Sequence, residues 1–201
     1  MSDLFSSAGL ETGAPRPLAD RLRPSKLSDV VGQSHLTEPQ STLGRMLKSG
    51  HLSSLIFWGP PGTGKTTTAR LLAEDTDLYF EQISAVFSGV ADLRKCFEAA
   101  KERRRTGKGT LLFVDEIHRF NRSQQDGFLP YVENGTIVLV GATTENPSFE
   151  LNAALLSRMQ VLTLNRLDSG AMEELLIRAE TLEDKKLPLT EEARALLYNM
   201  A

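Results

Sequence analysis

The chain has 201 residues, a net charge of −3 and a single cysteine, and 40% of its residues are hydrophobic. This balance is typical of a soluble globular protein, and the longest apolar runs are far too short to cross a bilayer. The start of the chain lacks a basic segment followed by an apolar one, which argues against a secretory signal. The cysteine, Cys96, rules out an intramolecular disulfide and a cysteine-based zinc site and fits a reducing compartment. We therefore predict a cytoplasmic protein without membrane contact.

The negative net charge gives no overall field that would draw the chain onto nucleic acid, so such contact would need a local basic patch. The candidate patch is formed by residues close together in the sequence, Lys101, Arg103, Arg104, Arg105 and Lys108. Cations at the end of a helix also complement its dipole, and the sequence favours this second interpretation.

Residues 1–17 are rich in serine, glycine and proline, and we expect them to form a flexible tail. Helices are predicted over residues 35–48, 65–74, 90–105 and 121–132, and strands over 55–58, 78–83, 110–114, 136–140 and 160–164. Strands separated by helices indicate an α/β fold with a parallel five-stranded sheet flanked by helices. After residue 167 the pattern is only helical, with helices expected over 169–182 and from 190. We therefore predict a core over residues 18–165 and the start of a small helical domain over 166–201.

A glycine-rich loop joins the first predicted strand to the helix that follows it. Residues 59–66 fit the pattern Gly-x-x-x-x-Gly-Lys-[Ser/Thr]: Gly59, Pro60, Pro61, Gly62, Thr63, Gly64, Lys65 and Thr66. Glycines let the backbone wrap closely around a phosphate, and the helix adds the positive end of its dipole. Lys65 is expected to reach the β- and γ-phosphates, and the Thr66 hydroxyl to bind Mg²⁺. The loop therefore predicts a P-loop site for ATP and Mg²⁺.

Further candidate residues follow the later strands. Asp115 would hold Mg²⁺ and Glu116 would deprotonate the attacking water, although an acidic strand end that caps the next segment has the same pattern. Thr144 follows the fourth strand at the carboxyl edge, where ligands of parallel sheets bind, but an ordinary turn threonine is the alternative. Arg158 would neutralise charge in the transition state, while the pattern alone favours a surface arginine in a salt bridge. We interpret His118 as a polar neighbour rather than a metal ligand.

Several of these segments occur together in one known group of proteins. Residues 17–24, 29–33, 59–66 and 115–121 resemble the AAA+ ATPases of the clamp-loader clade. Three longer stretches, residues 83–90, 123–126 and 141–152, are similar to the family of replication-associated recombination proteins, the bacterial relatives of the Werner helicase-interacting protein. The resemblance runs from about residue 17 to the end of the chain.

The resemblance implies roles for particular residues. The adenine would be covered by the segments that contain Leu22, Arg23, Pro24, Val30 and Val31, and Thr67 would join the nucleotide-binding residues. Thr144 matches the sensor of the γ-phosphate, and Arg158 matches the arginine finger that acts on ATP in a neighbouring subunit. Members of the family are DNA-stimulated, nucleoid-associated ATPases that form tetramers, associate with single-strand-binding protein and act at stalled or gapped replication forks. Arg119 and Arg122 are hypothetical DNA contacts.

Members of the family are longer than this chain, with a complete lid and an oligomerisation domain, and the nucleotide-sensing lid arginine is expected beyond Ala201. We therefore expect weak hydrolysis by this chain alone. Two other functions compete with the first: a clamp-loader subunit or Holliday-junction branch-migration motor, and a scaffold that binds ATP without turnover. The stretch Asn146-Pro147-Ser148-Phe149 disfavours the former. The presence of Lys65, Asp115, Glu116 and Arg158 disfavours the scaffold for the intact protein.

Overall fold

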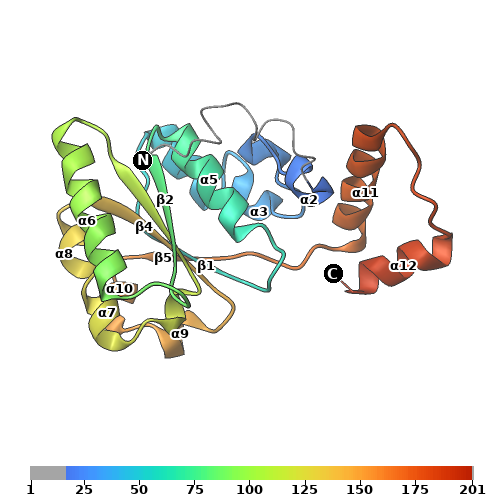
Figure 1. Cartoon of the computed structure of the whole chain (residues 1–201). Coiled ribbons are helices and arrows are strands. Elements are labelled where there is room, and N and C mark those ends of the chain that lie inside the picture. The colour runs from blue at the N-terminus through green and yellow to red at the C-terminus, as the bar shows by residue number, and fades with distance from the viewer. Residues whose placement is uncertain (1–16, 201) are drawn as a thin grey trace, which may run out of the picture.

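In the computed structural model, which describes residues 17–200, a parallel sheet forms the centre of the chain (Figure 1). Its strands are β1 (Leu55–Trp58), β2 (Tyr79–Ser84), β3 (Thr110–Asp115), β4 (Ile137–Thr143) and β5 (Gln160–Thr163). They lie in the order β2-β3-β4-β1-β5, and every neighbouring pair is parallel. The predicted five-stranded parallel α/β fold is confirmed, and the tail predicted over residues 1–17 lies almost entirely outside the described residues.

Helices cover both faces of the sheet because successive side chains of each strand point to opposite sides. On one face, Leu55, Phe57 and Phe113 pack against α4 (Thr42–Ser49) and α5 (Lys65–Asp75). On the other face, Ile56 and Val114 belong to the cluster that includes residues of α6 (Val90–Arg105), α8 (Leu129–Glu133) and α10 (Ala153–Leu156), while α7 (Arg122–Asp126) contributes no side chain to it. Since all of these strand residues are fully buried, the sheet is a rigid base for the loops at its edges.

The helix predicted over residues 35–48 is wrong as a single element. The chain forms α3 (Ser34–Thr37) and α4, because Pro39 disfavours a helical conformation of Glu38, whose ψ of 151° is extended. Ser41 then caps α4 by accepting a hydrogen bond from the Gly44 N–H at 3.0 Å. The helix ends at Gly50, which adopts a left-handed φ of 67°.

Other differences concern short elements. The helix predicted over 121–132 is interrupted between α7 and α8, and β4 continues to Thr143. The structure also contains short helices that have too few turns to show a periodic pattern: α2 (Leu18–Arg21), η2 (Leu27–Asp29), η3 (Ile117–Arg119) and α9 (Pro147–Glu150). Within residues 17–200, no helix combines the length and the hydrophobicity that a membrane span requires.

The segment after β5 contains α11 (Ser169–Glu183) and α12 (Glu191–Met200) (Figure 1). Asp168 caps α11, since its Oδ1 accepts a hydrogen bond from the Ala171 N–H at 2.8 Å. Arg194 of α12 forms ion pairs with Glu173 and Glu180 of α11, which join the two helices. The domain boundary at residue 165 stays a prediction.

Gln33 ties the N-terminal segment to the end of the sheet. Its side-chain amide donates to the Asn165 carbonyl at 2.8 Å and accepts from the Asn165 N–H at 3.0 Å. The side chain is 1% exposed, so both hydrogen bonds are sheltered from water. The N-terminal segment and the chain leaving β5 are therefore held beside each other, where α11 begins.

Candidate active site

The loop between β1 and α5 has the conformation that a phosphate-binding loop needs. Gly62 and Gly64 have φ values of 80° and 90°, which side chains other than glycine rarely adopt. A side chain at Gly59 would meet the Leu164 carbonyl oxygen at 2.2 Å, so the close approach of two backbone segments requires glycine there. Gly64 lies at the N-terminus of α5, whose free N–H groups favour an anion at this end.

Lys65 lies across this loop. Its Nζ donates hydrogen bonds to the carbonyl oxygens of Gly59 and Pro60, both at 2.7 Å, and the buried Thr63 hydroxyl donates to the Pro60 carbonyl at 3.0 Å. Burial lowers the pKa of the Lys65 ammonium group, while the nearby Glu116 and Asp115 carboxylates oppose the shift. The loop carbonyls hold the ammonium group where it can reach a bound phosphate.

A cavity of about 690 Å³ lies at the carboxyl ends of β1, β3 and β4. Its lining combines predicted residues from separate parts of the sequence: Arg23, Pro61, Gly62, Gly64, Lys65, Thr66, Thr67, Asp115, Glu116 and Thr144. The parallel register explains this convergence, because Trp58 at the end of β1 lies opposite Thr143 at the end of β4. The structure therefore brings the predicted metal ligands and the predicted general base together.

Glu116 has a strained backbone and a carboxylate oxygen with no partner. Its φ of 51° is left-handed, which is uncommon for a residue with a side chain. Its Oε2 is buried and has no hydrogen-bond partner in the part of the chain that the structure describes. The His118 Nδ1 lies 3.3 Å from this oxygen but hydrogen-bonds to the Thr143 hydroxyl, at 2.9 Å. The Glu116 oxygen is therefore available to accept a proton or a hydrogen bond.

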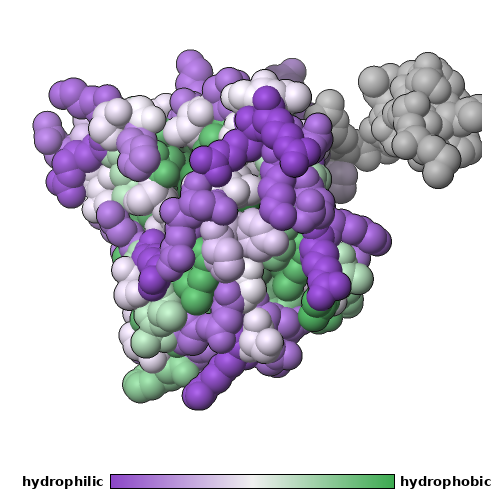
Figure 2. All heavy atoms as spheres, turned by 90° about the vertical axis from the view of Figure 1, so that its left-hand side faces the viewer, coloured by the Kyte–Doolittle hydropathy of each residue, from purple (hydrophilic) through white to green (hydrophobic). Residues whose placement is uncertain are grey.

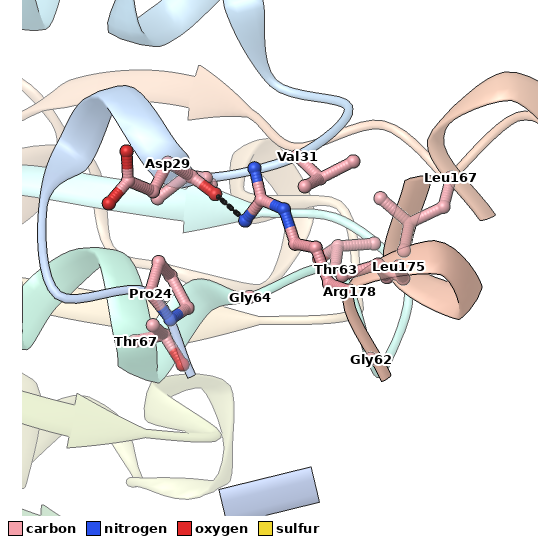
Figure 3. A pocket seen from close by; sticks show the side chains of 11 residues that line it. Pro24, Asp29, Val31, Gly62, Thr63, Gly64, Thr67, Leu167, Leu175 and Arg178 are labelled. Atoms are coloured by element: carbon pink, nitrogen blue, oxygen red, sulfur yellow. Dashed lines mark hydrogen bonds between the residues drawn. The ribbon is translucent and has the colours of Figure 1, made fainter. Parts of the chain in front are cut away.

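A second cavity, of about 100 Å³, adjoins the loop on the side of α11 (Figure 3). Its lining comes from the N-terminal segment, the loop, the first turn of α5 and the segment from Leu167 into α11: Pro24, Asp29, Val30, Val31, Gly62, Thr63, Gly64, Thr67, Leu167, Leu175 and Arg178. The Arg178 guanidinium donates to the Asp29 carbonyl at 2.7 Å, shown as the dashed line in Figure 3. Most of its walls are apolar, and it is continuous with the phosphate loop through Gly62 and Gly64. An adenine ring fits this chemistry.

Of the residues predicted to cover the adenine, Pro24, Val30 and Val31 line this second cavity. Arg23 lines the larger cavity beside it, and Leu22 lines neither. The structure thus brings the predicted segments to the site, but not every residue within them.

Arg158 lies far from these cavities, near the amino ends of the strands. It forms an ion pair with Glu133 at 2.6 Å and donates to the Ala154 carbonyl at 2.7 Å. It lines a separate cavity with residues 51–54 and Ile137, which precede or begin β1 and β4. Since a strand rises about 3.3 Å per residue, the length of β1 separates Arg158 from the phosphate loop of its own chain. Within one chain, Arg158 is therefore a salt-bridged surface arginine, as the sequence pattern alone favours.

Residues 55–167 match the model of the family described as "ATPase family associated with various cellular activities (AAA)". The chain belongs to the AAA family of ATPases. Its core is thus an AAA domain, and the predicted P-loop fold is confirmed.

Similar proteins narrow the position of the chain within the family. It is 53% identical to "Replication-associated recombination protein A" of Escherichia coli (strain K12) over 85% of this chain, and 49% identical to the Haemophilus influenzae protein of the same name over 92% of this chain. The chain covers 38% and 41% of these relatives. A solved structure of the Thermotoga maritima RuvB Holliday junction branch migration motor matches with a TM-score of 0.66 and 28% identity, covering 81% of this chain and 55% of that one. The resemblance to the replication-associated recombination proteins is confirmed.

Part of the candidate site has no signal in the local sequence. Leu167, Leu175 and Arg178 reach the second cavity from beyond β5, and no local pattern marks them, because only the fold returns this segment to the loop. His118 was interpreted as a polar neighbour, and the structure adds that it is mostly buried and joins the Glu116 segment to the end of β4. The strand that precedes His118 and the strand that ends at Thr143 are adjacent in the sheet. The sequence predicts the strands but not their order, so it does not indicate this contact.

The basic cluster on α6 has intramolecular partners. Arg103 pairs with Glu81 at 2.6 Å, Arg105 pairs with Glu102 at 2.8 Å, and Arg104 donates to the Asn134 carbonyl at 2.7 Å. Figure 2 shows hydrophilic side chains over much of the face that includes α6. These contacts support the interpretation of a solvated helix end rather than a nucleic-acid patch.

Proposed function

We propose that the chain binds Mg²⁺-ATP, hydrolyses it, and thereby serves as the motor domain of a replication-associated recombination protein. The fold and the relatives support an ATPase of this general class. The finer proposal is DNA-stimulated turnover, with DNA at stalled or gapped replication forks as the substrate of the motor. The chain covers less than half of the relatives, so these activities are proposed for the longer protein.

The residues at the carboxyl edge fit the chemistry of ATP hydrolysis. The Thr66 hydroxyl and the Asp115 carboxylate are oxygen donors of the kind that Mg²⁺ prefers, and they line one cavity. Bound Mg²⁺ would neutralise charge on the phosphates. Lys65 and the loop N–H groups would hold the β- and γ-phosphates, and Thr144 would position the attacking water.

The observation that carries the proposal of turnover is the buried, unpartnered Oε2 of Glu116 in the same cavity as Lys65. An unpaired polar atom of this kind costs stability, and a catalytic task is one explanation for it that the neighbouring Lys65 and Asp115 support. Glu116 would accept the proton of the attacking water. A scaffold that only binds ATP has no use for this carboxylate, so this observation favours hydrolysis.

Arg158 completes the proposal from a second copy of the chain. It lies near the amino ends of the strands, away from its own phosphate loop, so it can act on a phosphate only in another subunit. On binding, Arg158 would exchange Glu133 for the γ-phosphate. An oligomer would place Arg158 of one subunit beside the phosphate loop of the next. The resemblance to the recombination proteins favours a tetramer.

The partners proposed for the motor are forked or gapped DNA, reached in part through Arg119 and Arg122, and single-strand-binding protein. Both arginines are exposed at the edge that carries the candidate active site. The location proposed is the cytoplasm, in association with the nucleoid. Because the fold is similar to that of the RuvB branch migration motor, a Holliday junction is the alternative to forked or gapped DNA as the substrate.

Phosphate release with forked, gapped, four-way and no DNA tests the proposal, on this chain and on one extended to the full length of its relatives. We expect turnover in the longer protein that rises with forked or gapped DNA. Glu116→Gln should retain ATP binding and lose at least about a hundred-fold in kcat, the usual contribution of a general base. Unchanged turnover by this variant would remove Glu116 from its role, and stimulation only by four-way junctions would favour branch migration.

A further inference from the structure

Two phenylalanine side chains protrude from segments that follow the carboxyl ends of the strands, at the end of the sheet that carries the candidate active site. Phe87, in the turn between β2 and α6, is 90% exposed, and Phe149, in α9, is 85% exposed. A phenylalanine normally buries most of its surface, so two rings left in water require an explanation. Neither ring lines any cavity of the candidate active site.

Both rings are held in place by ordered backbone. The Phe87 and Ser88 N–H groups donate to the Ser84 carbonyl at 3.2 and 2.9 Å, so the turn after β2 is closed. The α9 segment is capped by Asn146, whose Oδ1 accepts from the Ser148 N–H at 3.0 Å, and Pro147 beside it is buried. The exposure of the rings is thus a feature of structured segments.

The parallel sheet brings the segments that carry the two rings to the same end of the strands. Ser84 pairs with Asp115, and Val114 pairs with Gly141, so β2, β3 and β4 end nearly level. Neighbouring strands lie about 4.8 Å apart, which places the ends of β2 and β4 about 10 Å from each other, a distance that a few nucleotides span.

Figure 1 shows α7 and α9 below the sheet, and in Figure 2 hydrophobic residues reach the surface toward the lower end of the molecule. Gln125 of α7 fixes this arrangement by donating to the Glu150 carbonyl at 3.2 Å.

Two arginines that lie between Phe87 and Phe149 in the sequence carry positive charge. Arg119 in η3 and Arg122 in α7 are exposed, and over residues 17–198 neither forms an ion pair or a side-chain hydrogen bond. The exposed carboxylates of Asp126, Glu145 and Glu150 lie on or beside α7 and α9, so the two arginines do not give this region a net positive charge. Binding of a polyanion here would need a contribution beyond electrostatics.

We propose that Phe87 and Phe149 are stacking platforms for the bases of single-stranded DNA, with Arg119 and Arg122 on its phosphates. Separated aromatic rings next to arginines match unpaired bases, whose faces are free, whereas the bases of a duplex are already stacked on each other. A protein partner would favour a continuous apolar face. Phe149 is instead flanked by the exposed polar residues Ser148 and Glu150, and only the turn that carries Phe87 has further exposed apolar side chains, Val86 and Val90. The inference rests on the proposed action on DNA and specifies the strand state and the residues.

The test is fluorescence anisotropy of a labelled oligothymidylate titrated with this chain and with the full-length protein. Phe87→Leu and Phe149→Leu should each weaken binding at least about five-fold, because a leucine keeps the apolar character but loses the ring. Phe→Tyr at either position should bind within about two-fold of the unchanged chain, because tyrosine also stacks. Val86→Ala, in the same turn and 55% exposed, is the matched apolar control and should leave binding unchanged.

Salt dependence separates stacking from phosphate contacts. Two phosphate contacts predict a slope of log affinity against log salt of about −1.4, and Arg122→Ala should reduce it by about 0.7. The leucine variants should retain the original slope at lower affinity. All variants should keep the melting temperature and ATP affinity of the unchanged chain, since both rings are on the surface and outside the nucleotide cavities.

The outcomes distinguish the inference from the proposed function. If neither protein binds the oligonucleotide or a duplex, the proposed action on DNA fails and the inference fails with it. If DNA binds and the leucine variants bind it equally well, the inference alone is wrong. If these variants instead lose self-association in sedimentation while DNA binding is unchanged, the edge is a contact between copies of the chain and stacking is refuted.

Discussion

Substituting Gly32 by alanine should disturb the adenine side of the nucleotide site without touching the phosphate loop. Gly32 has a φ of 74°, and an added Cβ would lie 2.6 Å from the Leu167 Cδ2 and 3.2 Å from the Ala171 Cβ. The left-handed backbone costs an alanine about 1–2 kcal/mol. The contacts add about 1–3 kcal/mol, toward the lower end, because the Leu167 side chain can rotate away while Ala171 is fixed on α11.

Gly50→Ala is a matched control for this substitution. Gly50 has a similar φ of 67°, and an added Cβ would meet nothing within 4 Å. Urea unfolding should therefore show a loss of about 1–2 kcal/mol for Gly50→Ala and about 2–4 kcal/mol for Gly32→Ala. The difference between the two variants measures the contact between the N-terminal segment and the start of α11.

Calorimetry completes the assay. Because Leu167 also lines the second cavity, Gly32→Ala should weaken binding of ATP but leave binding of tripolyphosphate, which lacks the base, unchanged. Gly50→Ala should change neither affinity. Equal losses of stability in the two variants, together with unchanged ATP binding, would refute the assignment of the adenine to this cavity.

Two further predictions concern Arg158 and Cys96. Arg158→Ala in the full-length protein should lower kcat by about a thousand-fold or more. Mixing this variant with Lys65→Ala subunits should restore activity, since some sites then combine an intact loop with an intact Arg158. Mixtures as inactive as either variant would contradict action between subunits. Burial, helped by the Glu81 carboxylate, raises the pKa of the Cys96 thiol. Alkylation of Cys96 at pH 8 should therefore be slower in the folded chain than in urea, and it should accelerate as the pH increases. Equal alkylation rates in the folded and unfolded chain would contradict a raised pKa.

The sequence predicts the sheet and the phosphate loop well because both depend on local patterns. Each strand is a short apolar run, and the loop needs glycine at Gly62 and Gly64, whose left-handed backbone is visible in the sequence as a motif. The break at Pro39 is equally local, but the helical spacing of Leu36, Leu43 and Leu47 on either side of it predicts one continuous helix.

The rest of the site depends on contacts between distant segments. Arg178 reaches Asp29 across the chain because the segment after β5 folds back on the N-terminal segment, and nothing near Arg178 in the sequence indicates this. The contact of His118 with Thr143 likewise follows from the adjacency of β3 and β4. The exposure of Phe87 and Phe149 contradicts their apolar character, so periodicity alone would assign them to the core.

The central claim is that Lys65 and its loop hold ATP in this chain. Isothermal titration of the chain with Mg²⁺-ATP tests it most directly, alongside Lys65→Ala, in which the ammonium group that bonds to the Gly59 and Pro60 carbonyls is missing. We predict one ATP per chain for the unchanged protein and loss of detectable binding for the variant at an unchanged melting temperature. ATP binding of equal affinity by the two proteins would contradict the assignment of the site.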